Sequence, residues 1–488
     1  MSGVKFLRLL LLSFPAVLCG CDSARQSQAE VGASVPATDA LFAERDMPGF
    51  PGCALAVARR GQVVYSRGYG SANLDYDIAI TPQTIFDVGS VTKQFTAASL
   101  SLLALDGRLS LDDDVRNWLP ELPQYESPIT LRHLVHHTSG LRDYLNLFPL
   151  AGRGEYFPIT HAQILAMMSR QKSLVFPPGE QYLYSNTGYM LLAQVIERAS
   201  GMSLGEFTRK RIFEPLGMAS SLMYEDKEAI IPRRATGYVS NAAGGPRIVH
   251  NYNFDIAGDG QLYTTMGDLL IWDHYLHGAN KPAIHEMMLT DGTLNSGESI
   301  GYAQGLVLDE YRGLRTIGHS GSSWGFRTQL LRFDEPELTI AISCNDGSAE
   351  PGRLARQVAE HYLAGQLGPL PEDSDANREE AAIPANEDFP ELASDTLRQY
   401  VGEYFSVELD ATYRFSLQDD ALVLRIEQEP AIAVRPTGVD ALAIDFDQQS
   451  LFSPWPASLD FTRGGAGEIT GFRLTSGSEV GIVFDRRR

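Results

Sequence analysis

The sequence has few cysteines and few basic residues, and it lacks a long uninterrupted hydrophobic run. Its 488 residues include four cysteines, and 40 Lys and Arg face 61 Asp and Glu, giving a net charge of -21. Nucleic-acid binding needs clustered basic side chains, so this balance argues against it. The HEXXH pattern and the cysteine spacing of zinc sites are also absent, so no metal and no other cofactor is expected. Hydrophobic residues still make up 44%, which is enough for a sizeable core, and the length suggests two or three domains.

The N-terminus contains the features of an exported lipoprotein. Lys5 and Arg8 precede an apolar run at 9–18, which is too short to stay in a membrane as a spanning helix. This arrangement predicts a secretory signal peptide at 1–20. The letters LCGC at 18–21 resemble a bacterial lipobox, which implies a lipid anchor on Cys21 and a membrane-bound protein facing the periplasm. A plain signal peptide that happens to contain cysteines is the alternative.

Composition divides the rest of the chain into four parts. Residues 21–39 are small and polar and predict a tether. Residues 40–367 carry mixed helix and strand patterns, and residues 368–395 are rich in Pro, Asp, Glu and Asn, which is typical of a linker. Residues 396–488 break into about eight short alternating runs without His or Cys, which predicts a small β-barrel or sandwich. Such an accessory domain could serve as a pocket lid, a dimer contact or a cell-wall binding module.

The region 40–367 begins and ends with strand patterns around a helical middle. Residues 51–69 read as a hairpin, residues 91–105 as a helix with one apolar face, and the stretch after 316 as further strands. Other helical patterns lie at 131–136, 160–170, 188–199 and 266–276. This order predicts a mixed α/β domain with one sheet whose strands come from distant sequence.

Ser-x-x-Lys places a hydroxyl and an amine one helical turn apart on the same face. The sequence matches it at Ser2–Lys5, Ser90–Lys93 and Ser169–Lys172. The first match lies in the signal peptide, and the third lies where a helical pattern ends. Only Ser90 stands where a helix begins, so that backbone N–H groups and the helix dipole favour a developing negative charge. We therefore expect Ser90 to be a nucleophile with Lys93 as its proton partner.

Two further patterns follow in order. Tyr184 and Asn186 form Tyr-x-Asn, and a second match at Tyr144 and Asn146 shows how little this pattern means alone. A tyrosine, whose pKa is about 10, is a poor base unless a cation lowers that value. Further along, His319-Ser320-Gly321 opens a strand pattern, where a small residue allows a substrate to lie against the strand edge.

The three patterns in this order resemble the motifs of class C β-lactamases, D-Ala-D-Ala carboxypeptidases and related serine hydrolases. The resemblance covers about residues 40–365 and implies a β-lactamase/transpeptidase-like fold, an antiparallel sheet flanked by helices plus a helical lobe. It also implies a serine acyl-enzyme that water hydrolyses, without a metal. The implied roles are nucleophile for Ser90, proton partner for Lys93, general base for Tyr184, substrate binding for Asn186, His319, Ser320 and Gly321, and oxyanion-hole N–H groups from Ser90 and Ser322.

One departure bears on the substrate, an amide or ester. Many β-lactamases have Lys where this chain has His319, and a His is mostly neutral at pH 7. The carboxylate of a β-lactam or of a D-Ala-D-Ala peptide therefore lacks that partner, although Arg327 could supply a charge. β-Lactams, D-amino-acid peptides and small esters all remain candidate substrates. A slowly turning over penicillin-binding sensor and a non-catalytic scaffold are the alternative functions.

Three other features have simpler explanations. Cys53 and Cys344 lie in strand patterns that the resemblance makes neighbours, and either a disulfide or two free buried thiols fits them. Gly-x-Ser-x-Gly around Ser323 matches a nucleophile elbow but is followed by a strand pattern rather than a helix. Three histidines at 133, 136 and 137 are interpreted as structural, since no third-ligand spacing accompanies them.

Overall fold

The computed structural model of the protein describes residues 36–154, 157–241, 244–249, 254–370, 392–427, 429–446 and 456–487. The expected signal peptide, Cys21, most of the tether and most of the linker lie outside these ranges. Within them, none of the helices combines the length and the apolar character that a membrane crossing requires.

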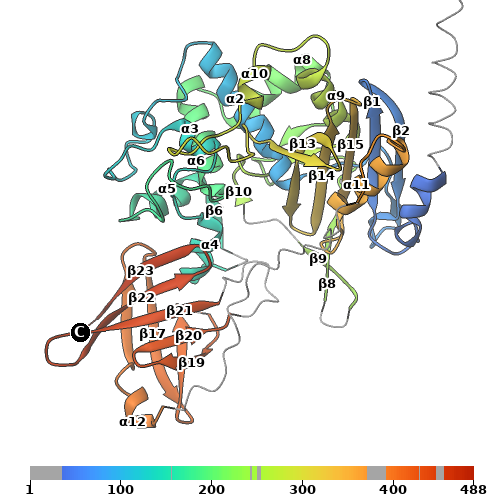
Figure 1. Cartoon of the computed structure of the whole chain (residues 1–488). Helices are drawn as coiled ribbons and strands as arrows, with labels where there is room; N and C mark the ends of the chain where they lie inside the picture. Colours follow the sequence, from blue (N-terminus) through green and yellow to red (C-terminus); the bar gives the residue numbers. More distant parts are fainter. Residues whose placement is uncertain are drawn as a thin grey trace, which may run out of the picture.

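A six-stranded antiparallel sheet forms the centre of the larger domain (Figure 1). Its strands, in spatial order, are β12 (Val307–Tyr311), β13 (Leu314–Ser323), β14 (Phe326–Phe333), β15 (Leu338–Cys344), β1 (Cys53–Arg59) and β2 (Gln62–Tyr69). The first strand of the sheet, β1, thus pairs with β15, which lies almost 300 residues later in the chain, as the sequence pattern predicts. Cys53 lies opposite Cys344 in this pairing, and the two form a disulfide.

Helices cover both faces of this sheet because its central strands are apolar on both sides. Alternate side chains of β1 point to opposite faces. Leu55 and Val57 belong to the buried cluster that includes α11 (Pro351–Tyr362). Ala54 and Ala56 belong to the cluster that includes α9 (Met266–His277), and their small side chains let this helix lie close to the sheet.

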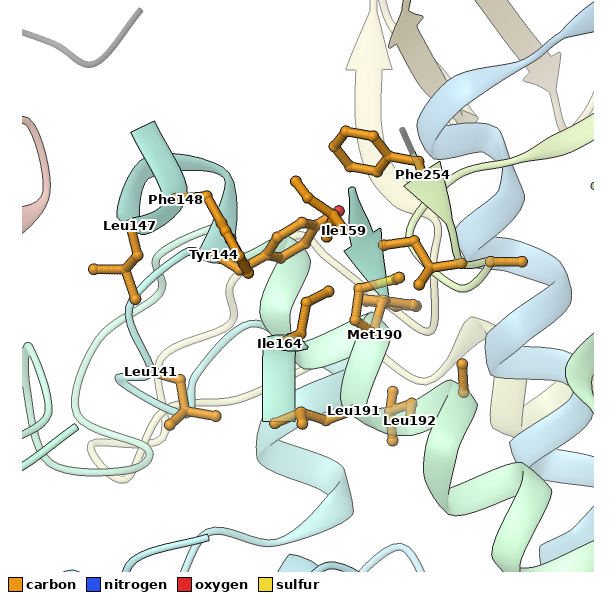
Figure 2. Packing of buried hydrophobic residues seen from close by; sticks show 14 of the residues in the cluster. Leu141, Tyr144, Leu147, Phe148, Ile159, Ile164, Met190, Leu191, Leu192 and Phe254 are labelled. Atoms are coloured by element: carbon orange, nitrogen blue, oxygen red, sulfur yellow. The ribbon is translucent and has the colours of Figure 1, made fainter. Parts of the chain in front are cut away.

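A helical lobe is built around α6 (Asn186–Ser200), whose side chains are mostly buried. The helices that pack on it are α2 (Lys93–Leu105), α3 (Leu131–Val135), α4 (Tyr144–Leu150), α5 (His161–Ser169) and α7 (Leu204–Thr208). Figure 2 shows part of their shared core, with side chains of α4, α5 and α6 grouped together. The sequence patterns predict most of these helices, but α4 is short and contains Pro149, so its pattern is not recognised.

Shorter elements connect the sheet to the lobe. The helical ones are η1 (Ala43–Arg45), η2 (Gly89–Thr92), η3 (Val115–Asn117), η4 (Arg209–Phe213), α8 (Glu214–Leu216) and α10 (His285–Leu289). The strands are β3 (Ser71–Asn73), β4 (Ile78–Ala79), β5 (Phe86–Asp87), β6 (Ile159–Thr160), β7 (Leu222–Met223), β8 (Gly237–Ser240), β9 (Pro246–Val249), β10 (Phe254–Asp255) and β11 (Leu262–Thr264). Among them, β11 pairs with β5 and so brings two loops of the lobe together beside η2.

The C-terminal region forms a closed eight-stranded antiparallel barrel, preceded by the short helix α12 (Ser394–Leu397) (Figure 1). Its strands are β16 (Gly402–Ser406), β17 (Ala411–Gln418), β18 (Ala421–Ile426), β19 (Ile432–Gly438), β20 (Ala441–Ile444), β21 (Ala457–Arg463), β22 (Ile469–Ser476) and β23 (Glu479–Arg486). Pairing of β16 with β23 closes it, which removes both sheet edges. The expected α/β fold with a C-terminal all-β barrel is confirmed.

Candidate active site

Ser90 lies in the short helical turn η2, directly before α2. Two glycines allow strand β13 to approach this turn. A side chain at Gly89, whose φ is +51°, would come within 2.7 Å of the Ser322 backbone, and one at Gly321 would come within 2.0 Å of the Val88 carbonyl oxygen. The strand end is also tied to the turn by Asp87, which accepts hydrogen bonds from Ser323 Oγ (2.7 Å) and Gly89 N–H (3.0 Å). The backbone of Ser322 thus lies beside Ser90.

Lys93 is completely buried and points its amine at Ser90. Its Nζ donates hydrogen bonds to Ser90 Oγ (3.0 Å), to Asn186 Oδ1 (2.8 Å) and to the backbone oxygen of Asp259 (2.9 Å). Burial lowers the pKa of Lys93 to about 8, while the charges of Asp259 and Asp143 oppose this shift. A noticeable fraction of the amine is therefore neutral near pH 7 and able to accept a proton.

Tyr184 completes the expected trio of hydroxyl, amine and phenol. The Lys93 Nζ atom lies 4.9 Å from the centre of its ring. Burial holds the pKa of Tyr184 well above its usual range, although a hydrogen bond with Ser90 opposes the shift. On its other side the ring packs 4.3 Å from the ring of His137, whose Nδ1 accepts the N–H of Ser185. Tyr184 therefore remains a neutral phenol in this structure.

Asn186 begins α6 and is held by a partly buried carboxylate. Asp143, at the N-terminus of α4, accepts hydrogen bonds from the backbone N–H and from Nδ2 of Asn186, both at 2.8 Å. Since Nδ2 donates to Asp143, Oδ1 of the same amide faces Lys93 and accepts its hydrogen bond. Asp143 thus fixes the orientation of Asn186, which in turn is one of the hydrogen-bond acceptors of Lys93 Nζ.

A second buried carboxylate lies on the loop before β11. The Oδ2 atom of Asp259 accepts a hydrogen bond from Tyr144 Oη at 2.9 Å. Burial raises the pKa of Asp259 to about 6, against the opposing charge of Lys93. Asp259 is therefore mostly ionised at neutral pH and adds an acidic side chain to the pocket that Ser90 also lines.

The third expected motif lies on β13, where His319 is buried. Its Nε2 is 3.0 Å from Tyr302 Oη, and its Nδ1 is hydrogen-bonded to the backbone oxygen of Ser320. Burial and the charge of Lys93 lower the pKa of His319 to about 4, so its ring is neutral at pH 7. His319 therefore offers no positive charge to a substrate. Ser320 and Gly321 follow it on the strand that faces Ser90.

Ser323 and the histidines near α3, which the sequence analysis did not assign to the site, lie in surroundings that explain them structurally. Ser323 ends β13 and is followed by the strand β14, so the geometry of a nucleophile elbow is absent there. His133 completes a capping box at the start of α3, and His136 Nδ1 lies 3.0 Å from the Tyr302 backbone oxygen. In the part of the chain that the structure describes, no group of three or more His, Cys, Asp or Glu is arranged to hold a metal ion.

A pocket of about 300 Å³ opens over Ser90. Its wall is formed by Gly89, Ser90, Tyr144, Leu145, Asn186, Phe254, Asp259, Gly260, Gln261, Ser322, Ser323, Trp324 and Arg327. The pocket lining therefore includes the Ser90 hydroxyl, the acidic side chain of Asp259 from the lobe and the half-buried Arg327 on β14.

Sequence reasoning found the residues of the three motifs but missed Asp143, Asp259, Tyr144 and the role of His137 as a packing partner for Tyr184. One signal was present, because the second Tyr-x-Asn match begins at Tyr144. That residue lines the pocket and hydrogen-bonds Asp259, although its hydroxyl does not take the place of the Tyr184 hydroxyl.

Comparisons of the sequence with known proteins identify relatives over most of the chain. The profile of the family described as Beta-lactamase matches residues 38–363. The chain is 30% identical to penicillin-binding protein 4* of Bacillus subtilis over 406 residues, 80% of this chain and 86% of that protein. It is 31% identical to a D-aminopeptidase of Gluconobacter oxydans over 70% of this chain, but spans only 62% of that protein.

Solved structures share the fold at lower sequence identity. The octameric penicillin-binding protein homologue from Pyrococcus abyssi aligns with a TM-score of 0.59 at 24% identity, covering 93% of this chain and all of that one. The D-amino acid amidase from Ochrobactrum anthropi SV3, solved with L-phenylalanine amide, aligns with a TM-score of 0.55 at 24% identity. It covers 69% of this chain and 98% of that chain.

Proposed function

The chain belongs to the β-lactamase family of serine hydrolases, and we propose that its Ser90 forms an acyl-enzyme with amides and peptides that begin with a D-amino acid. The observation that carries this proposal is the 3.0 Å contact between Lys93 Nζ and Ser90 Oγ at the base of the pocket. Relatives named D-aminopeptidase support the substrate class.

In the proposed reaction, the neutral fraction of Lys93 takes the Ser90 proton while Oγ bonds to the substrate carbonyl carbon. The carbonyl oxygen becomes an oxyanion held by the backbone N–H groups of Ser90 and Ser322. When the tetrahedral intermediate collapses, the C–N bond breaks and Lys93 returns the proton to the leaving amine. A water molecule then attacks the ester carbonyl and gives a proton to Lys93; the bond between Ser90 Oγ and the carbonyl carbon breaks, and Lys93 passes that proton to Oγ as the acid leaves.

Lys93 suits the role of base better than Tyr184, the residue that the resemblance implies. A base is most effective when its pKa lies near the working pH. The pKa of Lys93 is about 8, whereas burial raises that of Tyr184 far above neutrality. Tyr184 accordingly acts as a neutral hydrogen-bonding partner of Ser90, passing a proton between Lys93 and the leaving group without becoming a phenolate.

Charges around the pocket favour a substrate with a free amine. Asp259 belongs to the lining and is mostly ionised at pH 7, so it attracts an ammonium group. His319 is neutral, so the cation that many β-lactamases offer to a carboxylate is missing at that position. Arg327 is the cation in the described pocket lining, and it makes carboxylate-bearing substrates such as β-lactams the second candidate class.

A chromogenic panel tests the proposal. D-Alanine p-nitroanilide is expected to be hydrolysed faster than its L-enantiomer and than N-acetyl-D-alanine p-nitroanilide, which lacks the amine. Ser90→Ala should lower this activity by about 10⁴-fold or more, while Ser169→Ala, in the other mature Ser-x-x-Lys match, should leave it unchanged. Equal rates with and without the N-acetyl group would refute the proposed attraction of the substrate amine by Asp259. Full activity in Ser90→Ala would refute the acyl-enzyme mechanism.

Incubation with benzylpenicillin distinguishes a hydrolase from a penicillin-binding sensor that turns over slowly. Intact-mass measurement should show at most a transient penicilloyl adduct on Ser90 if the protein turns β-lactams over. A stoichiometric adduct that persists for hours, together with no steady release of p-nitroaniline after a first burst, would favour the sensor. The D-Ala-D-Ala carboxypeptidase type is tested on the same preparation with a peptide ending in D-Ala-D-Ala.

Export and lipid anchoring are also part of the proposal. Support comes from the basic start, the short apolar run and the LCGC sequence ending at Cys21. In a Gram-negative host, the native protein should incorporate labelled palmitate and sediment with membranes, facing the periplasm. Cys21→Ser should abolish both, and soluble, unlabelled native protein would refute the anchor.

A further inference from the structure

The C-terminal barrel contacts the loop that carries Asp143. We propose that Glu479, at the start of barrel strand β23, is a positioning residue for the acyl-transfer site, which it holds through Asp143 and Asn186. The inference rests on the proposed chemistry at Ser90 and assigns to the barrel a part in that chemistry.

Glu479 is 1% exposed and binds the N-terminus of α4. Its Oε1 atom accepts a hydrogen bond from the backbone N–H of Asp143 and another from Nδ2 of Asn146, both at 3.1 Å. Its second oxygen, Oε2, has no hydrogen-bond partner among the described residues. A buried acid that is only half satisfied costs folding free energy, so the contact with α4 is not explained by stability alone.

From Glu479 the contacts run directly to the nucleophile. The carboxylate of Asp143 holds both the N–H and the side-chain amide of Asn186. Asn186 Oδ1 accepts the hydrogen bond of Lys93 Nζ, which in turn donates to Ser90 Oγ. Every link is a hydrogen bond of 3.1 Å or less between buried or partly buried groups. A shift of the Asp143 backbone therefore changes the position of Lys93.

A second acid of the barrel fixes the preceding residue. Glu408 is 3% exposed; its Oε1 accepts the N–H of Lys172 at 2.9 Å and lies 3.5 Å from Arg142 Nη1. Arg142 also donates to the backbone oxygen of Val480 at 2.9 Å. Consecutive residues of the lobe, Arg142 and Asp143, are thus both held by the barrel, which restrains the backbone at that point.

The distribution of buried charge agrees with this role. Within the described barrel residues, Glu408 and Glu479 are the buried acids, and both contact the lobe rather than the barrel interior. The interior is filled instead with aromatic rings, including Tyr404, Phe415 and Phe472. The buried acids of the described barrel thus lie where it meets the lobe segment that leads to Asn186, whereas other charged side chains, such as Arg414 and Glu403, are exposed.

The test measures labelling of Ser90 by a fluorophosphonate probe in the full-length protein, from pH 5 to 10. Glu479→Ala should slow labelling by about tenfold or more, because small displacements of reacting groups have large effects on rate. Glu479→Gln keeps an oxygen for the Asp143 N–H and should stay within about threefold of native. In Glu479→Ala, Lys93 loses a fixed acceptor for its ammonium form, so the acid limb of the pH profile should also move to lower pH.

A matched interface variant separates positioning from simple attachment. Tyr413→Phe removes another hydrogen bond between barrel and lobe, from Tyr413 Oη to the backbone oxygen of Leu150 at the far end of α4. It should leave the labelling rate and pH profile unchanged. The proposal is overturned if Glu479→Ala labels like the native protein, or if Tyr413→Phe slows labelling equally.

Glu479→Asp covers the case in which the alanine variant does not fold. It keeps the carboxyl group but withdraws its oxygens by one methylene, so labelling should be intermediate, and a native rate would overturn the proposal. Failure of the proposed function looks different, because the native protein itself would then fail to label at Ser90.

Discussion

The catalytic domain and the barrel differ in the kinds of side chain that they bury. The domain that carries Ser90 buries Lys93 and Asp259 and partly buries Asp143, all within one hydrogen-bonded group. The barrel closes around a cluster of aromatic rings, in which Phe472 lies 4.5 Å from Phe484 and 5.0 Å from Phe461. Each arrangement has its own cost, since buried charges weaken the fold and a purely apolar interior offers no chemistry.

This difference indicates that the catalytic domain is arranged mainly for activity and the barrel mainly for stability. The buried charges at the site shift one another's pKa values, which suits the proposed acyl transfer. The barrel is stabilised by its apolar core and closed sheet, and the acids that it buries, Glu408 and Glu479, contact the lobe. Substitutions in the two regions are therefore expected to separate loss of activity from loss of stability.

The largest effect is expected at Lys93. Lys93→Met should lower the acylation rate by about 10³-fold, because it removes the proton acceptor. The melting temperature should fall only slightly, because the loss of a costly buried ammonium is offset by carboxylates of Asp259 and Asp143 that lose their cation. Lys172→Met, in the other mature Ser-x-x-Lys match, is the control and should leave both unchanged. A melting temperature that falls strongly in Lys93→Met would contradict the division between the two regions.

Phe472 provides the reverse case in the barrel. Phe472→Ala should lower the free energy of unfolding of the barrel by about 3–5 kcal/mol, because it leaves a cavity in the aromatic cluster. Chemical denaturation followed by tyrosine and tryptophan fluorescence measures this loss. Val439→Ala, at a barrel position that is 91% exposed, should change stability by less than about 0.5 kcal/mol. A loss below about 1 kcal/mol at Phe472 would show that the cluster repacks.

The disulfide lies in the catalytic domain, so the stability of that domain, and not that of the barrel, should depend on the redox conditions. Replacing both Cys53 and Cys344 with Ala should destabilise the catalytic domain by about 2–4 kcal/mol, because the bond closes a long loop in the unfolded chain. Reduction of the native protein with TCEP should have a similar effect. The barrel sequence contains no cysteine, so its unfolding transition should not respond. A reductant-sensitive barrel transition would mean that the two regions unfold as one unit.

The smallest expected effect is a shift in pH dependence. The pKa of Lys93 is about 8 and the charge of Asp259 raises it, so acylation should increase with pH and level off above that value. Asp259→Asn removes the charge and should move the acid limb of the profile down by about one unit. Rates of fluorophosphonate labelling between pH 5 and 10 measure it. An unmoved or upward-shifted limb would show that Asp259 does not tune the amine.

Local patterns in the sequence were enough to predict many of the strands, the spacing of Ser90 and Lys93, and the family. Alternating apolar residues predicted β1, β14, β15 and the barrel strands, and the turn between Ser90 and Lys93 placed the hydroxyl and amine on one face. The order of three motifs was enough to indicate the family. These signals are readable because strand and helix periods depend only on residues that are close in the chain.

The contacts that position the site residues, and the pKa values of those residues, are determined only by the tertiary structure. Asp143, Asp259 and Glu479 match no motif, and they meet Asn186, Tyr144 and α4 through contacts between segments 40 to more than 300 residues apart. The pKa values of Lys93 and Tyr184 likewise follow from burial, which no local pattern records. Desolvation and pairing of charges depend on everything that surrounds a group in space, so the preference for Lys93 as base and the contribution of the barrel appear only in the folded chain.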